Sequence, residues 1–146
     1  MCSSSGGEET LVLTSSDPKT LRQFLEAVLE RCKTSGFSEN DIFAIRLCYE
    51  EAVANALIHG NRRDPTKKVT VRCQFGPDWI RLRIEDEGEG FDPATVPDPT
   101  APENLTRPSG RGLLLMRHYM EVTVHPPGNI VELLRRKSSS DLDRRH

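Results

Sequence analysis

The segment at residues 38–60 constrains the fold most strongly, because it is compatible with one helix and is apolar on nearly every side. Ser38 and Asp41 resemble a capping box with Asp in place of Glu, and Gly60 is suited to end the helix. Its apolar residues point in several directions: Ile42, Ile45, Tyr49, Ala52, Val53, Ala56 and Leu57. The sequence therefore predicts a central helix that is covered on more than one side.

Three polar residues interrupt this apolar helix. Glu51, Asn55 and His59 recur every four residues, which places them on one face. Unpaired polar groups are costly to bury, so the stripe indicates a ligand or a partner. Alternatively, Glu51 and Asn55 form a structural hydrogen-bonded pair, and His59 interacts with the dipole at the helix end. Glu50 points about 100° away from the stripe and is expected to face solvent or a partner.

The rest of the chain alternates between helical and strand patterns. The expected elements are a strand at 10–14, a helix at 18–34, strands at 68–75 and 79–84, a helix at 110–120, and strands at 121–124 and 130–134. Helices that are segregated from paired strands predict the α+β class. We expect a two-layer sandwich in which a mixed, mainly antiparallel sheet carries helices on one face.

An acidic, glycine-rich turn follows the strand at 79–84. The carboxylate of Asp86 can accept a hydrogen bond from an exocyclic amine, and Gly88 and Gly90 allow the backbone to approach a flat base or sugar. The alternative is a plain acidic turn between a strand and a loop.

A second glycine-rich turn opens the helix at 110–120. Gly110 and Gly112 expose backbone N–H groups at a helix start, where phosphates are stabilised. In isolation, a flexible helix start is the favoured interpretation of this turn. The loop before it, at 92–108, holds five prolines, and a loop of this length in a compact domain is usually functional.

Taken together, the order and spacing of these motifs resemble those of the GHKL (Bergerat-fold) ATPases. Glu51-x-x-x-Asn55-Ala56-x-x-His59-Gly60 is similar to their N box, Asp86-x-Gly88-x-Gly90-Phe91 to their G1 box, and Gly110-x-Gly112-Leu113 to their G2 box. The chain looks most like the anti-sigma-factor serine kinases. The resemblance implies a Bergerat ATP-binding domain at residues 10–136, with flexible segments at 1–9 and 137–146.

The resemblance also implies roles for individual residues. Glu51 would be the general base that takes the proton from a substrate serine. Asn55 would ligate a Mg²⁺ ion, and Asp86 would fix the adenine amino group of ATP. The remaining expected nucleotide contacts are Gly88, Gly90, Gly110, Arg111 and Gly112, with the loop at 92–108 as a lid. His59 is aligned with the motif but is assigned no chemical step.

The function that the resemblance implies is an ATP-dependent protein-serine kinase and anti-sigma factor. Such proteins phosphorylate a small antagonist protein, sequester a sigma factor by partner switching, and are commonly homodimers. Two alternatives stay open. One is a non-catalytic ATP-binding module that sequesters a partner, and the other is a detached histidine-kinase ATP-binding domain. The latter fits less well, because no phosphoacceptor-histidine helix pair precedes the ATP-binding region.

Composition limits the other possibilities. A chain of 146 residues has room for one domain, and its net charge of -2 gives no general attraction to nucleic acid or to an anionic membrane. Residues 1–9 lack an apolar signal segment, so we expect a cytoplasmic protein. The four cysteines are scattered, which indicates reduced thiols. The basic clusters at 135–137 and 144–145 are expected to solvate a tail.

Overall fold

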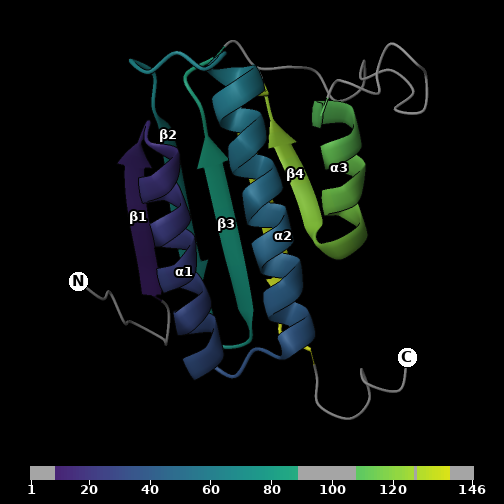
Figure 1. Cartoon of the computed structure of the whole chain (residues 1–146). Coiled ribbons are helices and arrows are strands. Elements are labelled where there is room, and N and C mark those ends of the chain that lie inside the picture. The colour runs from purple at the N-terminus through teal and green to yellow at the C-terminus, as the bar shows by residue number, and fades with distance from the viewer. Residues whose placement is uncertain (1–8, 89–107, 127, 139–146) are drawn as a thin grey trace.

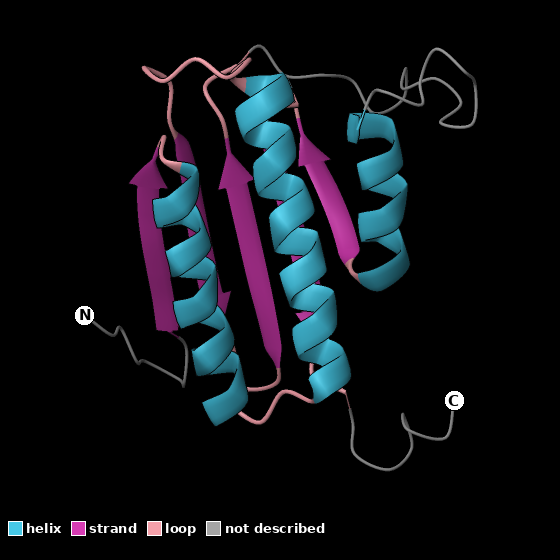
Figure 2. Ribbon diagram, viewed as in Figure 1, coloured by secondary structure: helices cyan, strands magenta, loops and turns pink. Residues whose placement is uncertain are grey.

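Helices α1 (Pro18–Thr34), α2 (Glu39–Asn55) and α3 (Pro108–Tyr119) lie on one face of a five-stranded sheet (Figures 1 and 2). The computed structural model describes residues 9–88, 108–126 and 128–138, and the side chains of 108–111 are outside that description. The strands are β1 (Glu9–Ser15), β2 (Val69–Phe75), β3 (Trp79–Glu85), β4 (Glu121–His125) and β5 (Ile130–Arg136). This arrangement confirms the predicted α+β sandwich.

The sheet has the strand order β1-β2-β3-β5-β4, and the paired strands of the described chain are all antiparallel. Side chains alternate between its two faces, as period-two sequences require. One row of the helix-facing side runs from Leu11 through Cys73 and Leu82 to Leu133, each opposite the next. Three of these four are completely buried, so the core lies between the sheet and the helices.

Helix α2 is the central element of the helical layer, with α1 on one side and α3 on the other (Figure 1). The predicted capping box is present: Ser38 Oγ accepts from the Asp41 N–H, and Asp41 Oδ2 accepts from the Ser38 N–H, both at 3.1 Å. The buried residues of α2 include Ile45, Cys48 and Tyr49. Burial on several sides is confirmed, since the sheet and both neighbouring helices contact α2.

Three element boundaries differ from the prediction by two residues or more. The helix expected to reach Gly60 as an α-helix ends at Asn55 and continues as a π-helical turn, η2 (Ala56–Gly60). Helix α3 begins at Pro108, a residue suited to a first helical turn because its missing N–H has no intrahelical partner there. Strand β5 extends to Arg136 because residues 135 and 136 pair with Ile80 and Trp79.

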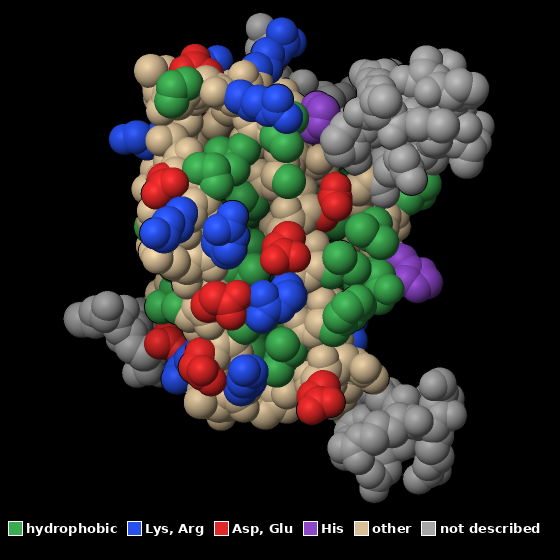
Figure 3. Space-filling model, viewed as in Figure 1, with side chains coloured by type: hydrophobic (Ala, Val, Ile, Leu, Met, Phe, Trp, Pro, Cys, Tyr) green, Lys and Arg blue, Asp and Glu red, His purple; other side chains and the backbone are tan. Residues whose placement is uncertain are grey.

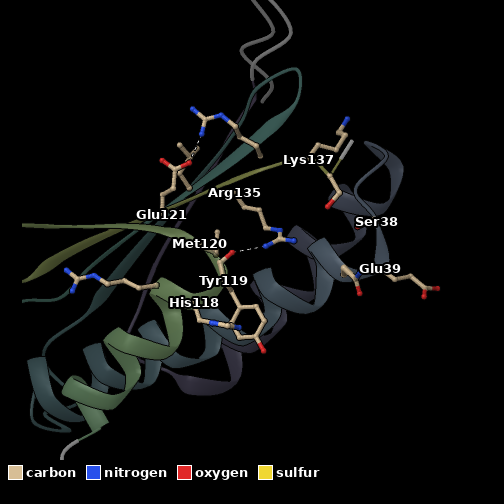
Figure 4. Close-up of a pocket in the computed structure, with 13 residues that line it drawn as sticks. Ser38, Glu39, His118, Tyr119, Met120, Glu121, Arg135 and Lys137 are labelled. Atoms are coloured by element: carbon tan, nitrogen blue, oxygen red, sulfur yellow. Dashed lines mark hydrogen bonds and ion pairs between the residues drawn. The ribbon is translucent and has the colours of Figure 1, made fainter. Parts of the chain in front are cut away.

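The expectation that Arg135 solvates a tail is wrong, because its side chain points inward from β5. Its Nε donates to Asp41 Oδ1 at 2.8 Å, and its Nη1 donates to the Tyr119 carbonyl at 2.7 Å. Figure 4 shows Arg135 turned toward Tyr119 in a cavity of about 920 Å³ between the start of α2 and the end of α3. Arg135 thus joins β5 to the ends of two helices.

Asp41, the partner of Arg135, is a completely buried carboxylate with 0% exposure. It also accepts from the Ser138 N–H at 3.0 Å and from the Ser138 hydroxyl at 2.6 Å. Burial opposes its ionisation, but the bonds from Ser138, Ser38 and Arg135 outweigh burial and hold the pKa of Asp41 below its ordinary value. This buried charge is therefore stabilised by hydrogen bonds at each oxygen.

The domain boundaries at residues 10 and 136 stay a prediction, since residues 1–8 and 139–146 lie outside the described chain. Lys137 donates from Nζ to the Ser35 carbonyl at 2.6 Å.

Cys32, Cys48 and Cys73 are buried free thiols, as expected, whereas Cys2 is outside the described residues. Within the described residues, the helices are too short or too polar to span a membrane.

Replacing Asp41 by alanine tests the buried cluster. Asp41→Ala leaves the partly buried Arg135 without its carboxylate and the α2 N-terminus without half of its capping box. We expect a loss of about 3 kcal/mol in the free energy of unfolding, measured by urea denaturation. Glu26→Ala is the matched control, because Glu26 pairs with Arg46 on the surface and should contribute little. Equal stability of both variants would contradict a structural role for the cluster.

Candidate functional site

The chain leaves α2 through the wide turn η2. The Asn61 N–H donates to the Ala56 carbonyl and the Arg63 N–H to the Leu57 carbonyl, both at 2.8 Å. Arg62 and Arg63 then adopt left-handed φ values of 53° and 59°. A non-glycine residue in this region costs of order 1 kcal/mol, and both such strain and π-helical turns are frequent at functional sites. Neither feature was predictable from the residue pattern.

The end of η2 lies directly against the turn that follows β3. A Cβ on Gly60 would collide with the Asp86 carboxylate, and a Cβ on Gly88 would collide with the Gly60 carbonyl. Asp86 Oδ1 accepts from the Gly88 N–H at 2.7 Å. Glycine is therefore required at 60 and 88 for the two segments to meet, and the structure brings Asp86 and Gly88 together with the end of the α2 stripe.

Two asparagines hold this turn, and neither belongs to a motif that predicted a role for it. The Asp86 N–H donates to the Asn129 carbonyl, and Asn129 Nδ2 donates to the Asp86 carbonyl, both at 3.0 Å. On the other side, Asn61 Oδ1 accepts from the Glu87 N–H at 2.8 Å. Asn61 follows the Glu51–Gly60 motif directly, and that adjacency was the only available signal for it.

The other end of the stripe lies against the start of α3. A Cβ on Gly112 would stand 2.5 Å from Glu51 Oε2 and 2.9 Å from Asn55 Nδ2, so only glycine allows this approach. The shared face predicted for Glu51 and Asn55 is thus confirmed, and Gly112 joins them. Gly110 and Arg111 lie in the first turns of α3, and their contacts are outside the described residues, as is Gly90.

The amide oxygen of Asn55 is an unpaired acceptor. Within the described chain, Asn55 Oδ1 is buried and has no hydrogen-bond partner. An amide oxygen is a hard ligand of the kind that Mg²⁺ accepts, and Mg²⁺ is commonly held by one or two protein oxygens together with substrate phosphates. The position of Asn55 beside Gly112, one turn after the start of α3, therefore fits a cation that bridges to phosphate.

Burial disfavours the charged form of both acidic residues. It raises the pKa of Glu51 above its ordinary value. It also raises the pKa of Asp86, an effect that the Gly88 N–H and Lys67 oppose and the charge of Glu85 reinforces. A carboxylate with a raised pKa is a stronger base, which suits Glu51 to proton transfer.

The polar residues outside the site behave as surface groups. The side chains of Glu50 and His59 are both exposed, and Glu50 agrees with its predicted position. The face formed by α1 and α2 carries acidic and basic side chains intermixed with apolar ones (Figure 3). The converging residues are therefore Glu51 and Asn55 of the stripe, the Asp86 turn and the first turns of α3, whereas His59 lies outside the site.

Sequence comparison agrees with this convergence. A profile described as "Histidine kinase-like ATPase domain" matches residues 14–135. The chain belongs to this family of ATPases. An anti-sigma F factor of Oceanobacillus iheyensis is 34% identical over 85 residues, which cover 56% of this chain and 58% of that protein. An anti-sigma F factor of Anoxybacillus flavithermus is 30% identical over 109 residues, which cover 69% of this chain and 73% of that protein.

These comparisons confirm the predicted resemblance to the GHKL ATPases and to the anti-sigma-factor serine kinases. The membership implies that the domain binds ATP. The chain spans less than two thirds of the length of the Oceanobacillus protein. The roles of individual residues are proposals that the geometry supports.

The raised pKa of Glu51 predicts how stability depends on pH. The folded protein holds a proton on Glu51 more tightly than the unfolded chain does, so the free energy of unfolding falls as pH rises from 4.5 through the folded-state pKa. Glu51→Gln removes this contribution and should lose less stability over the same interval, as measured by urea denaturation. Glu50→Gln is the control for an exposed glutamate. Parallel curves for wild type and Glu51→Gln would contradict the prediction.

The contact between Gly60 and Asp86 predicts the effect of a single methyl group. Gly60→Ala forces the Asp86 carboxylate to move, so we expect affinity for ATP to fall by about tenfold or more, measured by calorimetric titration. Circular dichroism would confirm that the variant is folded. Unchanged affinity in a folded variant would show that Asp86 does not contact the nucleotide.

Proposed function

We propose that this protein is an ATP-dependent protein-serine kinase and anti-sigma factor, which phosphorylates a small antagonist protein and sequesters a sigma factor. The main support is the convergence of Glu51, Asn55 and Gly112 at one end of α2, in a chain related to anti-sigma F factors. A carboxylate of raised pKa beside a phosphate-binding helix start is suited to serine phosphorylation.

The position of each group supports the binding role that we propose for it. Asp86 accepts a hydrogen bond from the adenine amine, and Gly60 and Gly88 allow the close approach of the two segments that holds this carboxylate at the end of η2. Gly110 and Arg111 lie in the first turn of α3, which would face the phosphates, and Gly112 in the next turn allows α3 to approach Glu51 and Asn55. When bound at Asn55, Mg²⁺ supplies positive charge that neutralises the phosphate oxygens. The Asn55 oxygen is available for this role because it has no hydrogen-bond partner among the described residues.

Glu51 acts as the general base in the proposed reaction. It takes the proton of the substrate serine hydroxyl while the serine oxygen forms a bond to the γ-phosphorus of ATP. The bond from that phosphorus to the bridging oxygen breaks, and ADP leaves. Positioning of the reactants and neutralisation of the phosphate charge account for most of the reduction of the activation barrier, and Glu51 contributes the proton transfer.

The remaining proposals concern partners and location. We propose a homodimer that works in the cytoplasm through protein partners, without direct contact to nucleic acid or membrane. The net charge of -2 is consistent with this choice, because nucleic-acid-binding domains usually carry a strong basic surplus.

A phosphorylation assay tests the proposal. Wild type, Glu51→Ala and the control Glu50→Ala are incubated with Mg-ATP and candidate antagonist proteins encoded by the same genome. Intact-mass and peptide mass spectrometry should find phosphoserine with wild type and Glu50→Ala, and at least about a hundredfold less with Glu51→Ala.

Two outcomes of this assay contradict a serine kinase. A stable complex with an antagonist but no phosphate would indicate an ATP-binding module that only sequesters partners. Acid-labile phosphate on histidine would instead indicate a histidine-kinase ATP-binding domain.

A further inference from the structure

We propose that Asn61 is the residue that positions the base-recognising turn, and thereby sets the preference of the site for adenine over guanine. The inference rests on the proposed ATP site. Asn61 belongs to none of the three motifs, and its side chain contacts the backbone of the turn, so it acts through Asp86.

The carboxamide of Asn61 bridges two chain segments. Its side chain is 1% exposed, and it is one of two buried polar or charged residues within the described chain. Its Oδ1 accepts from the Glu87 N–H at 2.8 Å, and its Nδ2 donates to the Lys68 carbonyl at 3.0 Å. These bonds tie the turn at residues 86–88 to the residue before β2, and they use one acceptor and one donor of the amide.

The backbone around Asn61 is arranged to bury it. The turn η2 ends with the Asn61 N–H bonded to the Ala56 carbonyl, which directs Asn61 inward. The next residues, Arg62 and Arg63, are exposed, and both adopt left-handed backbone conformations. Strained backbone persists only where the surrounding contacts determine it. The two hydrogen bonds of the Asn61 side chain are such contacts. The strained backbone at Arg62 and Arg63 therefore indicates that Asn61 is held in one position.

Asn61 and Asn129 hold opposite sides of Asp86. Asn129 bonds the N–H and the carbonyl of Asp86 itself, whereas Asn61 bonds the next N–H along the chain. Loss of Asn61 therefore leaves the Asn129 bonds in place and frees only the side of the turn at Glu87. The Asp86 carboxylate would then shift relative to Gly60 without unfolding β3.

This shift has a chemical consequence for base choice. Adenine presents an amine donor where guanine presents a carbonyl acceptor. A fixed Asp86 carboxylate accepts from the amine of adenine and repels the oxygen of guanine. A carboxylate that moves freely can turn away from guanine, so the ratio of ATP to GTP affinity should decrease together with ATP affinity.

The test compares Asn61→Ala with wild type and with Asn40→Ala, an exposed asparagine at the opposite end of α2. Calorimetric titrations with Mg-ATP and Mg-GTP give the affinity ratio, and amide hydrogen exchange reports the Glu87 and Asp86 N–H groups. For Asn61→Ala we expect about tenfold weaker ATP binding, a several-fold lower ATP/GTP ratio and fast exchange at Glu87, with Asp86 still protected. Asn40→Ala should match wild type.

A second variant keeps the test decisive if Asn61→Ala does not fold. Asn61→Asp keeps an acceptor for the Glu87 N–H and loses the donor to Lys68, so Glu87 should stay protected and the ATP/GTP ratio should stay closer to wild type. An unchanged ratio in folded Asn61→Ala, or the absence of folding in both variants, would show a purely structural role and overturn the inference. Absence of nucleotide binding by wild type would instead overturn the proposed function.

Discussion

The contact between the end of α2 and the end of β3 is the constraint on which the rest of the site depends. The two segments meet with no space for a Cβ at Gly60 or Gly88, so the helix carries its polar stripe directly to the acidic turn. Any side chain at these positions would separate Asp86 from the stripe. The π-helical turn and the two left-handed arginines are the local backbone changes that accompany this approach.

Helix α2 connects two polar clusters of different kinds. At its start, Asp41 is buried with hydrogen bonds from Ser38, Arg135 and Ser138, which hold the helix to β5 and to the chain after it. At its end, Asn55 presents a buried oxygen with no partner within the described chain. The satisfied cluster stabilises the fold, whereas the unsatisfied oxygen is the group available to a ligand.

Much of the fold was predictable because its signals are local. The apolar pattern of α2, its capping box and the hairpin of β2 and β3 follow from periodicity and turn residues, and the structure has each of them. The shared face of Glu51 and Asn55 was predictable for the same reason, since helical spacing fixes it.

The remaining features depend on contacts between residues distant in sequence. Arg135 looked like part of a basic tail, because its partner Asp41 lies 94 residues earlier in the chain. No motif singled out Asn61 or Asn129, because their bonds to the Asp86 turn form only after the sheet and α2 are packed. The π-helical turn likewise reflects packing against that turn, and local propensity does not encode it.

The central claim is that the α2 stripe, the Asp86 turn and the start of α3 form one nucleotide site. An NMR titration of the labelled protein with Mg-ATP tests it most directly. The account predicts that the amide signals of residues 51–61, 86–88 and 112–113 shift together with one affinity, while those of residues 38–41 at the far end of α2 stay unchanged. Shifts confined to the far end, or separate affinities for the three segments, would contradict it.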